Sequence, residues 1–134
     1  KAPSRKRQGG FTLTELMIAL LVASLVLAGY IGANIQAQRN NEDLHERTLA
    51  LQDANRVIEQ MRNASRTGDF PHNVVTAFPE NAPVEGYESL QNETVTVAYA
   101  NSSANPLTAT ITVTWTSYTG RDSAEQMTVY ITQR

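Results

Sequence analysis

The feature that most constrains this chain is a long uncharged segment near its N-terminus. No Asp, Glu, Lys or Arg occurs between Glu15 and Arg39, and most of the residues between them are apolar. About 23 residues with a helical rise of 1.5 Å each would extend roughly 34 Å, which matches the ~30 Å hydrocarbon core of a bilayer. The segment therefore predicts a helix that spans a membrane.

A single carboxylate, Glu15, lies at the start of this segment. A charged side chain deep in a bilayer costs about 2.5–3.5 kcal/mol on insertion scales, so acidic groups in such helices usually serve a function. Glu15 ends the sequence GFTLTE, which begins at Gly10 and follows a basic stretch. This combination resembles the prepilin processing motif of type IV pilins and type II secretion pseudopilins.

The resemblance implies a processing site. In that family a prepilin peptidase cleaves after the glycine that corresponds to Gly10 and methylates the new N-terminal residue, here Phe11. Glu15 would then form an ion pair with the amine of Phe11 in a neighbouring subunit and so favour the correct axial register. A second interpretation stays open, in which Glu15 only caps the first turn of the helix. The implied partners are other pilin subunits, the prepilin peptidase and an inner-membrane assembly platform.

Charge is distributed unevenly along the chain. Removing the four basic residues of the predicted leader, residues 1–10, from the formal net charge of −2 leaves −6 for the rest. Basic residues before an apolar span predict a cytoplasmic N-terminus and an exported C-terminal part. The resemblance further implies a single-pass inner-membrane precursor that later lies in a pilus or pseudopilus, in the periplasm or at the cell surface. An acidic exported part makes nucleic acid an unlikely non-specific partner. A secretory signal peptide fits less well, because the apolar run is too long and lacks an Ala-x-Ala-like site.

The helix is expected to continue past the membrane. We divide the chain into a leader (1–10), an assembly half of the helix (11–38) and a head (39–134). Within the head, residues 39–66 are rich in good helix formers, and Gly68 with Pro71 would end the helix. Gly29 and Gly32 are expected to soften the assembly half of the helix. Asp43 and Arg47 have the spacing of an ion pair on the helix surface. The apolar residues expected to pack on the sheet are Leu44, Leu51, Ala54, Val57, Ile58 and Met61. For the glycines, close packing between helices is an equal alternative.

The last forty residues read as strands. Apolar residues alternate with threonine, which is the period of a strand with one buried face. The connection, residues 67–92, is expected to be irregular, with a short strand near Val74 to Phe78. The predicted strands are Thr94–Ala100, Leu107–Thr116 and Met127–Thr132. The predicted hairpin loops are Asn101–Pro106 and Tyr118–Glu125. The predicted fold is α+β and pilin-like, with a long helix packed on three or four antiparallel strands. The chain has no cysteine, which excludes the disulfide that closes many pilin heads.

Other candidate sites carry weak signals. His45 and His72 lack companions at metal-ligand spacing, and Asp122 with Glu125 lacks a full set of oxygen ligands for calcium, so no metal or cofactor is expected. No nucleophile elbow, metalloprotease helix or phosphate-binding glycine loop occurs, which argues against an enzyme.

The predicted function is structural. The strand pattern of the C-terminal region is similar to that of V-type minor pilins and I-type minor pseudopilins, so we expect a minor pilin at the initiating complex or tip of a type IV pilus. The alternatives are a minor pseudopilin of a type II secretion system and, in another class, a tip module that binds DNA or a surface. The last would need a basic patch made by Arg62, Arg66 and Arg121.

Overall fold

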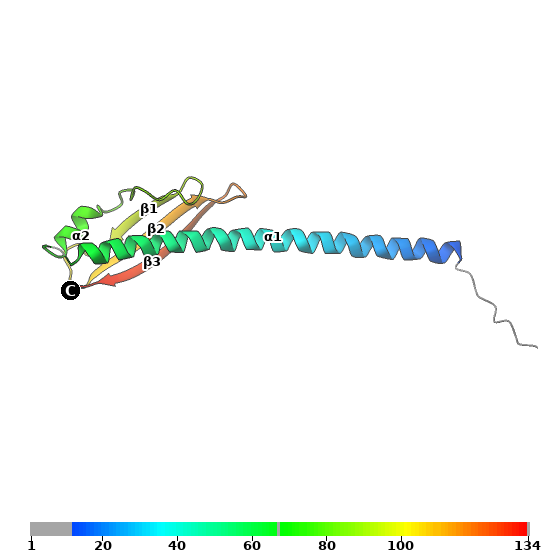
Figure 1. Ribbon diagram of the computed structural model, residues 1–134, viewed down its shortest axis with the longest axis horizontal. Coiled ribbons are helices and arrows are strands. Elements are labelled where there is room, and N and C mark those ends of the chain that lie inside the picture. The colour runs from blue at the N-terminus through cyan, green and yellow to red at the C-terminus, as the bar shows by residue number, and fades with distance from the viewer. Residues whose placement is uncertain (1–11, 67, 134) are drawn as a thin grey trace, which may run out of the picture. The chain divides into compact units, whose positions relative to one another are not determined.

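The computed structural model describes residues 12–66 and 68–133. The elements follow in the order α1 (Leu13–Ala64), α2 (His72–Ala77), β1 (Thr94–Tyr99), β2 (Leu107–Thr116) and β3 (Asp122–Ile131) (Figure 1). The chain divides into two compact units, Lys1–Asn40 and Asn41–Arg134. We call the second unit the head and describe each unit by itself.

The head contains one antiparallel sheet in the order β1-β2-β3. β2 is the central strand and spans the residues that the alternation predicts. Its pairing with β1 places Val97 opposite Ile111, and its pairing with β3 places Met127 opposite the same residue. One face of the sheet is therefore apolar, and the other is largely threonine. Together with the helix, this is the predicted α+β, pilin-like fold.

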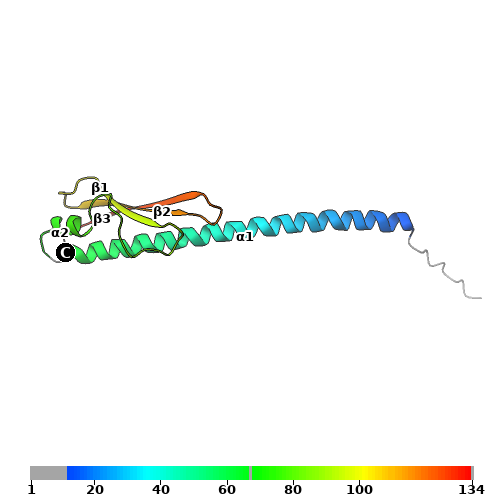
Figure 2. The ribbon, with the colours of Figure 1, turned by 90° about the horizontal axis from the view of Figure 1, so that it is seen from above.

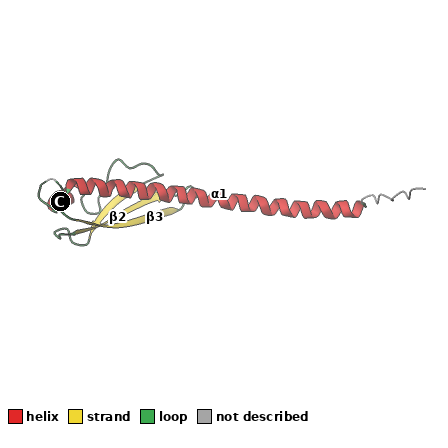
Figure 3. Cartoon of the chain, turned by 60° about the horizontal axis from the view of Figure 1, so that its bottom comes forward, coloured by secondary structure: helices red, strands yellow, loops and turns green. Residues whose placement is uncertain are grey.

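The apolar face packs on the C-terminal part of α1, which lies alongside the sheet in Figures 2 and 3. The buried helix positions recur every three or four residues, as one face of an α-helix requires. The predicted stripe is wrong at its N-terminal end, because Leu44 is 61 % exposed and Leu51 37 % exposed. The helix buries Ala50 and Ala54, because their small side chains let the sheet approach closely. Hydropathy ranks leucine above alanine and therefore predicted the wrong residues. The buried residues of α1 are Ala50, Asp53, Ala54, Val57, Ile58 and Met61.

A short helix and an irregular segment connect α1 to β1. The predicted strand near Val74 to Phe78 is wrong: α2 includes Val74 to Ala77, Phe78 follows as its C-cap, and only Val74 of that helix is buried. The side-chain amide of Asn73 donates a hydrogen bond to the carbonyl of Ala64, which satisfies an acceptor at the end of α1. Residues 78–93, here called the connecting segment, then run along β1. The N–H groups of Asn81 and Val84 donate to the carbonyls of Val97 and Val95, and an isolated bridge joins Pro83 to Thr96.

β3 begins five residues before the predicted Met127, at Asp122. Its first half lacks the apolar alternation because Ser123 and Glu125, not apolar residues, lie on the face that meets α1. Nε of Arg47 lies 3.5 Å from Oε1 of Glu125. The helical spacing predicted that Arg47 pairs with Asp43. This prediction is wrong, because Arg47 pairs with Glu125 of the sheet.

Candidate functional site

The N-terminal unit carries the residues on which the predicted assembly role depends. α1 starts at Leu13, directly after Thr12. The backbone N–H and the hydroxyl of Thr12 each donate to Oε2 of Glu15 at 2.9 Å, and the N–H of Glu15 lies 3.3 Å from the Thr12 hydroxyl oxygen. This reciprocal arrangement is a capping box, which satisfies donors that the first turn of a helix leaves without partners.

The two interpretations of Glu15 are compatible with this geometry. Both hydrogen bonds from Thr12 end on Oε2, and within residues 12–66 and 68–133 Oε1 has no hydrogen bond. The capping interpretation therefore describes the single chain, while Oε1 is left for a further donor. Gly10 and Phe11 lie outside the described residues, so the cleavage site and the ion pair with the Phe11 amine stay predictions.

The apolar side chains of this unit are turned outward. From Leu13 to Ile35, the large hydrophobic side chains expose between 46 and 77 % of their surface. Among the described residues, α1 is the one helix long and apolar enough to cross a membrane. The core helix of a soluble protein would bury such residues, whereas this exposed apolar surface fits a helix that contacts lipid or other helices.

Polar groups within the apolar helix are satisfied locally. The Ser24 hydroxyl donates to the carbonyl of Leu21 at 2.8 Å, which removes the cost of a free hydroxyl in lipid. Gly29 and Gly32 lie in uninterrupted helix, and a Cβ added at either would meet nothing within 4 Å. No contact with the residues that the structure describes explains these glycines, so helix flexibility and packing against another helix both stay predictions.

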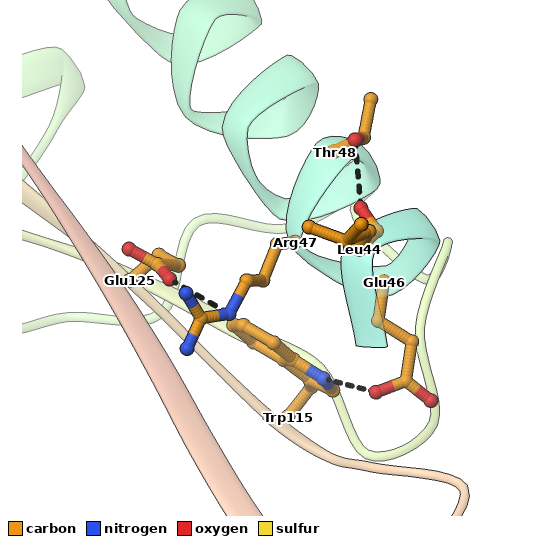
Figure 4. A network of polar contacts seen from close by, with 6 residues as sticks. All are labelled: Leu44, Glu46, Arg47, Thr48, Trp115 and Glu125. Atoms are coloured by element: carbon orange, nitrogen blue, oxygen red, sulfur yellow. Dashed lines mark hydrogen bonds and ion pairs between the residues drawn. The ribbon is translucent and has the colours of Figure 1, made fainter. Parts of the chain in front are cut away.

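A polar network in the head was missed by sequence reasoning. Figure 4 shows Glu46 and Arg47 projecting from α1 towards the sheet. Oε2 of Glu46 accepts a hydrogen bond from Nε1 of Trp115 at 3.1 Å, and Oε1 accepts one from the N–H of Tyr118 at 2.8 Å. The only available signal was the amphipathic nature of tryptophan, whose buried ring usually finds an acceptor for its N–H.

Glu46→Ala is expected to destabilise the head by about 1–3 kcal/mol, because Nε1 of the 4 % exposed Trp115 would lose its acceptor. Urea unfolding of the full chain in detergent, followed by the fluorescence of Trp115, measures the change; the chain has one tryptophan. Glu42→Ala, at an exposed position one turn earlier, is the matched control. Equal midpoints for the two variants would show that the network contributes nothing.

The remaining sequence candidates do not form sites in the described residues. His45 and His72 are exposed, and no cluster of three metal-ligating side chains occurs there. Asp122 and Glu125 lie three residues apart on β3, so alternation places them on opposite faces.

The structure does not form the basic patch that the alternative of DNA binding would need. A shallow pocket of the head is lined by Arg62 and Arg66 together with Tyr130 and Ile131 at the C-terminal end of β3. Arg121 precedes Asp122, at the opposite end of the same strand. Because a strand rises about 3.3 Å per residue, roughly 30 Å of β3 separate Arg121 from the pocket. The three arginines therefore do not make one surface for a phosphate backbone.

Comparison with known families gives one match. Residues 5–31 match the model described as the prokaryotic N-terminal methylation motif. The match includes Gly10, Phe11 and Glu15 and continues into the exposed apolar part of α1. Comparisons with curated proteins and with solved structures found no match.

Proposed function

We propose that this chain, which carries the N-terminal methylation motif characteristic of type IV pilins and pseudopilins, is a minor pilin that acts at the initiating complex or the tip of a type IV pilus. The observation that carries the proposal is the continuity of the motif with an exposed helix. The matched residues run directly into a capped helix whose large apolar side chains face outward from Leu13 to Ile35. A protein of this kind has a structural role and not an enzymatic one.

The same helix serves two environments in this proposal. Before assembly, its apolar side chains contact the lipid of the inner membrane, and the head lies on the exported side. Prepilin peptidase then cleaves between Gly10 and Phe11 and methylates the new amine. The mature chain enters the filament when the apolar side chains exchange lipid for neighbouring helices, a transfer that van der Waals packing and small residues favour.

Glu15 sets the axial register between neighbouring subunits in this exchange. A carboxylate transferred from the membrane edge into a bundle of helices requires compensation. The capping box supplies part of it through Thr12. The amine of Phe11 in the adjacent subunit supplies the rest through Oε1, and it reaches that atom only when the subunits have the correct axial offset.

The second candidate is a minor pseudopilin of a type II secretion system, since the same motif characterises both classes. The absence of a cysteine pair supports a minor over a major subunit, and the C-terminal strands are similar to those of both V-type minor pilins and I-type minor pseudopilins. Deleting the gene distinguishes the two. Loss of surface pili with normal secretion of folded enzymes supports the minor pilin, and the reverse result supports the pseudopilin.

Processing tests the proposal most directly. The intact mass and the N-terminal residue of the chain would be measured after purification from cells with and without prepilin peptidase. We expect a peptidase-dependent start at methylated Phe11. A leader that persists in both strains, or cleavage at another residue, would contradict the proposal and indicate a membrane-anchored protein that never polymerises.

A further inference from the structure

A carboxylate lies in the buried stripe of α1, where an apolar residue would be expected. Asp53 is 1 % exposed. Its Oδ1 accepts a hydrogen bond from Nη1 of Arg56 at 2.9 Å, whereas Oδ2 is buried and has no hydrogen-bond partner. A buried polar atom without a partner costs free energy, so Oδ2 requires an explanation.

A second such oxygen belongs to Glu93, the last residue of the connecting segment before β1. Its Oε2 accepts a hydrogen bond from the N–H of Leu90 at 3.0 Å. Its Oε1 is buried and, like Oδ2 of Asp53, has no hydrogen-bond partner. These are the two buried side-chain atoms of the described residues that lack a partner.

The two carboxyl groups act on each other. Burial raises the pKa of Glu93 most, the hydrogen bond from Leu90 lowers it, and the charge and the side chain of Asp53 raise it further. The other ionisable groups that face the pair are Arg56 on α1 and Tyr87 in the connecting segment. Burial, followed by the charge of Asp53, raises the pKa of Tyr87, while Arg56 lowers it. Tyr87 therefore adds no charge at neutral pH.

Charge balance decides between a proton and a cation as the missing partner of these two oxygens. Two ionised carboxylates and one guanidinium leave a net charge of −1 in this partly buried place, and a single proton neutralises it. A divalent cation would instead leave +1, beside the Arg56 guanidinium, and would find only two carboxylates where calcium takes 6–8 oxygen ligands. One proton also gives both oxygens a partner at once.

We propose that Asp53 and Glu93 share one proton, in a carboxyl–carboxylate hydrogen bond that fastens the connecting segment to α1. Glu93 carries the proton and donates it to Oδ2 of Asp53, while Arg56 compensates the charge that remains. Loss of the proton leaves two negative charges face to face. The connecting segment then separates from α1 at Glu93 more readily, so the head responds to the acidity of its surroundings.

The sign of the pH dependence follows from the protonated group. A carboxyl group whose pKa is higher in the folded than in the unfolded state stabilises the fold at pH values below its ordinary pKa, which is 4.5 for glutamate. This contribution is lost as the pH rises through the folded-state pKa. One proton changes the folding equilibrium by at most about tenfold per pH unit in that window. The head is therefore expected to become less stable from mildly acidic to neutral pH.

Glu93→Gln tests the proposal, because the glutamine amide donates to Asp53 at every pH while its carbonyl still accepts from Leu90. Urea unfolding of the full chain in detergent, followed by Trp115 fluorescence, would be compared across this pH range. We expect the variant to match the original chain near pH 4.5 and to have a several-fold larger folding constant at neutral pH. Glu88→Gln, at an exposed position of the same segment, should retain the original pH dependence.

A direct readout does not depend on the stability of a variant. Carbon-13 NMR of the Glu93 carboxyl should give a titration midpoint above the ordinary glutamate value, and Asp53→Asn should lower that midpoint. A midpoint at or below the ordinary value overturns the shared proton. An unchanged pH dependence in Glu93→Gln would also overturn the shared proton. If stability rises with added calcium and falls with EDTA in the original chain but not in the variant, the site binds a cation instead.

Discussion

Glu15→Ala is expected to leave cleavage of the leader intact and to reduce incorporation of the chain into filaments by about two to three and a half orders of magnitude. In the proposed filament the variant would leave the Phe11 amine without a counter-charge among packed helices. Removing one partner of a buried ion pair costs about 3–5 kcal/mol, and each 1.4 kcal/mol is a factor of ten. The ratio of mature chain in sheared pili to mature chain in the membrane measures the effect.

Two further variants separate the ion pair from the capping box. Glu15→Gln keeps a side-chain oxygen that accepts from Thr12 but removes the charge, so it should fail as Glu15→Ala does. Thr12→Ala keeps the charge and removes the hydroxyl of the capping box, which costs only about 1 kcal/mol. If Glu15→Gln enters filaments normally while Thr12→Ala does not, Glu15 acts as a cap and not as an assembly charge. Glu42→Gln, at an exposed position of α1, is the control for loss of a carboxylate.

Ile111→Ala is expected to destabilise the head by about 2–5 kcal/mol, because it opens a cavity at the centre of the sheet. Ile111 is fully buried, between Val97 of β1 and Met127 of β3. Small domains have total stabilities of only about 5–15 kcal/mol, so the loss is a large fraction of the whole. Urea unfolding of the full chain in detergent, followed by Trp115 fluorescence, measures it.

Thr112→Ala supplies the matched comparison for this core substitution. Thr112 is the next residue of β2, points to the threonine-rich face and pairs with Thr96 and Gln126. Removing its hydroxyl and methyl group creates no internal cavity, so its unfolding midpoint should lie close to that of the original chain. Similar losses for both variants would mean that the two faces of the sheet contribute equally, contrary to the packing.

The parts of the fold that the sequence predicts are those where one physical rule acts alone. In β2, apolar residues alternate with threonine without interruption, since one face meets the helix and the other meets solvent. In the N-terminal part of α1, the uncharged segment overlaps the residues that match the methylation motif. These local patterns are sufficient for the α+β, pilin-like fold class, which the structure confirms.

Prediction failed where tertiary contacts replaced the local rule. The first half of β3 carries Glu125 on its helix-facing side because Arg47 compensates it, so the strand shows no alternation there. Asp53 occupies a core position that hydropathy assigns to an apolar residue. Its reason to be there lies forty residues away, in Glu93, and no local pattern connects the two.

The division of buried surface along the chain has a consequence for how such proteins diverge. Among the described residues, none before Ala50 is buried, and the core extends from there to Ile131. The residues that fold the head and those that the methylation motif covers therefore occupy separate stretches of the gene. Mutation can remodel one stretch while selection preserves the other. The family match, which covers residues 5–31, lies entirely before the first buried residue of the core, Ala50.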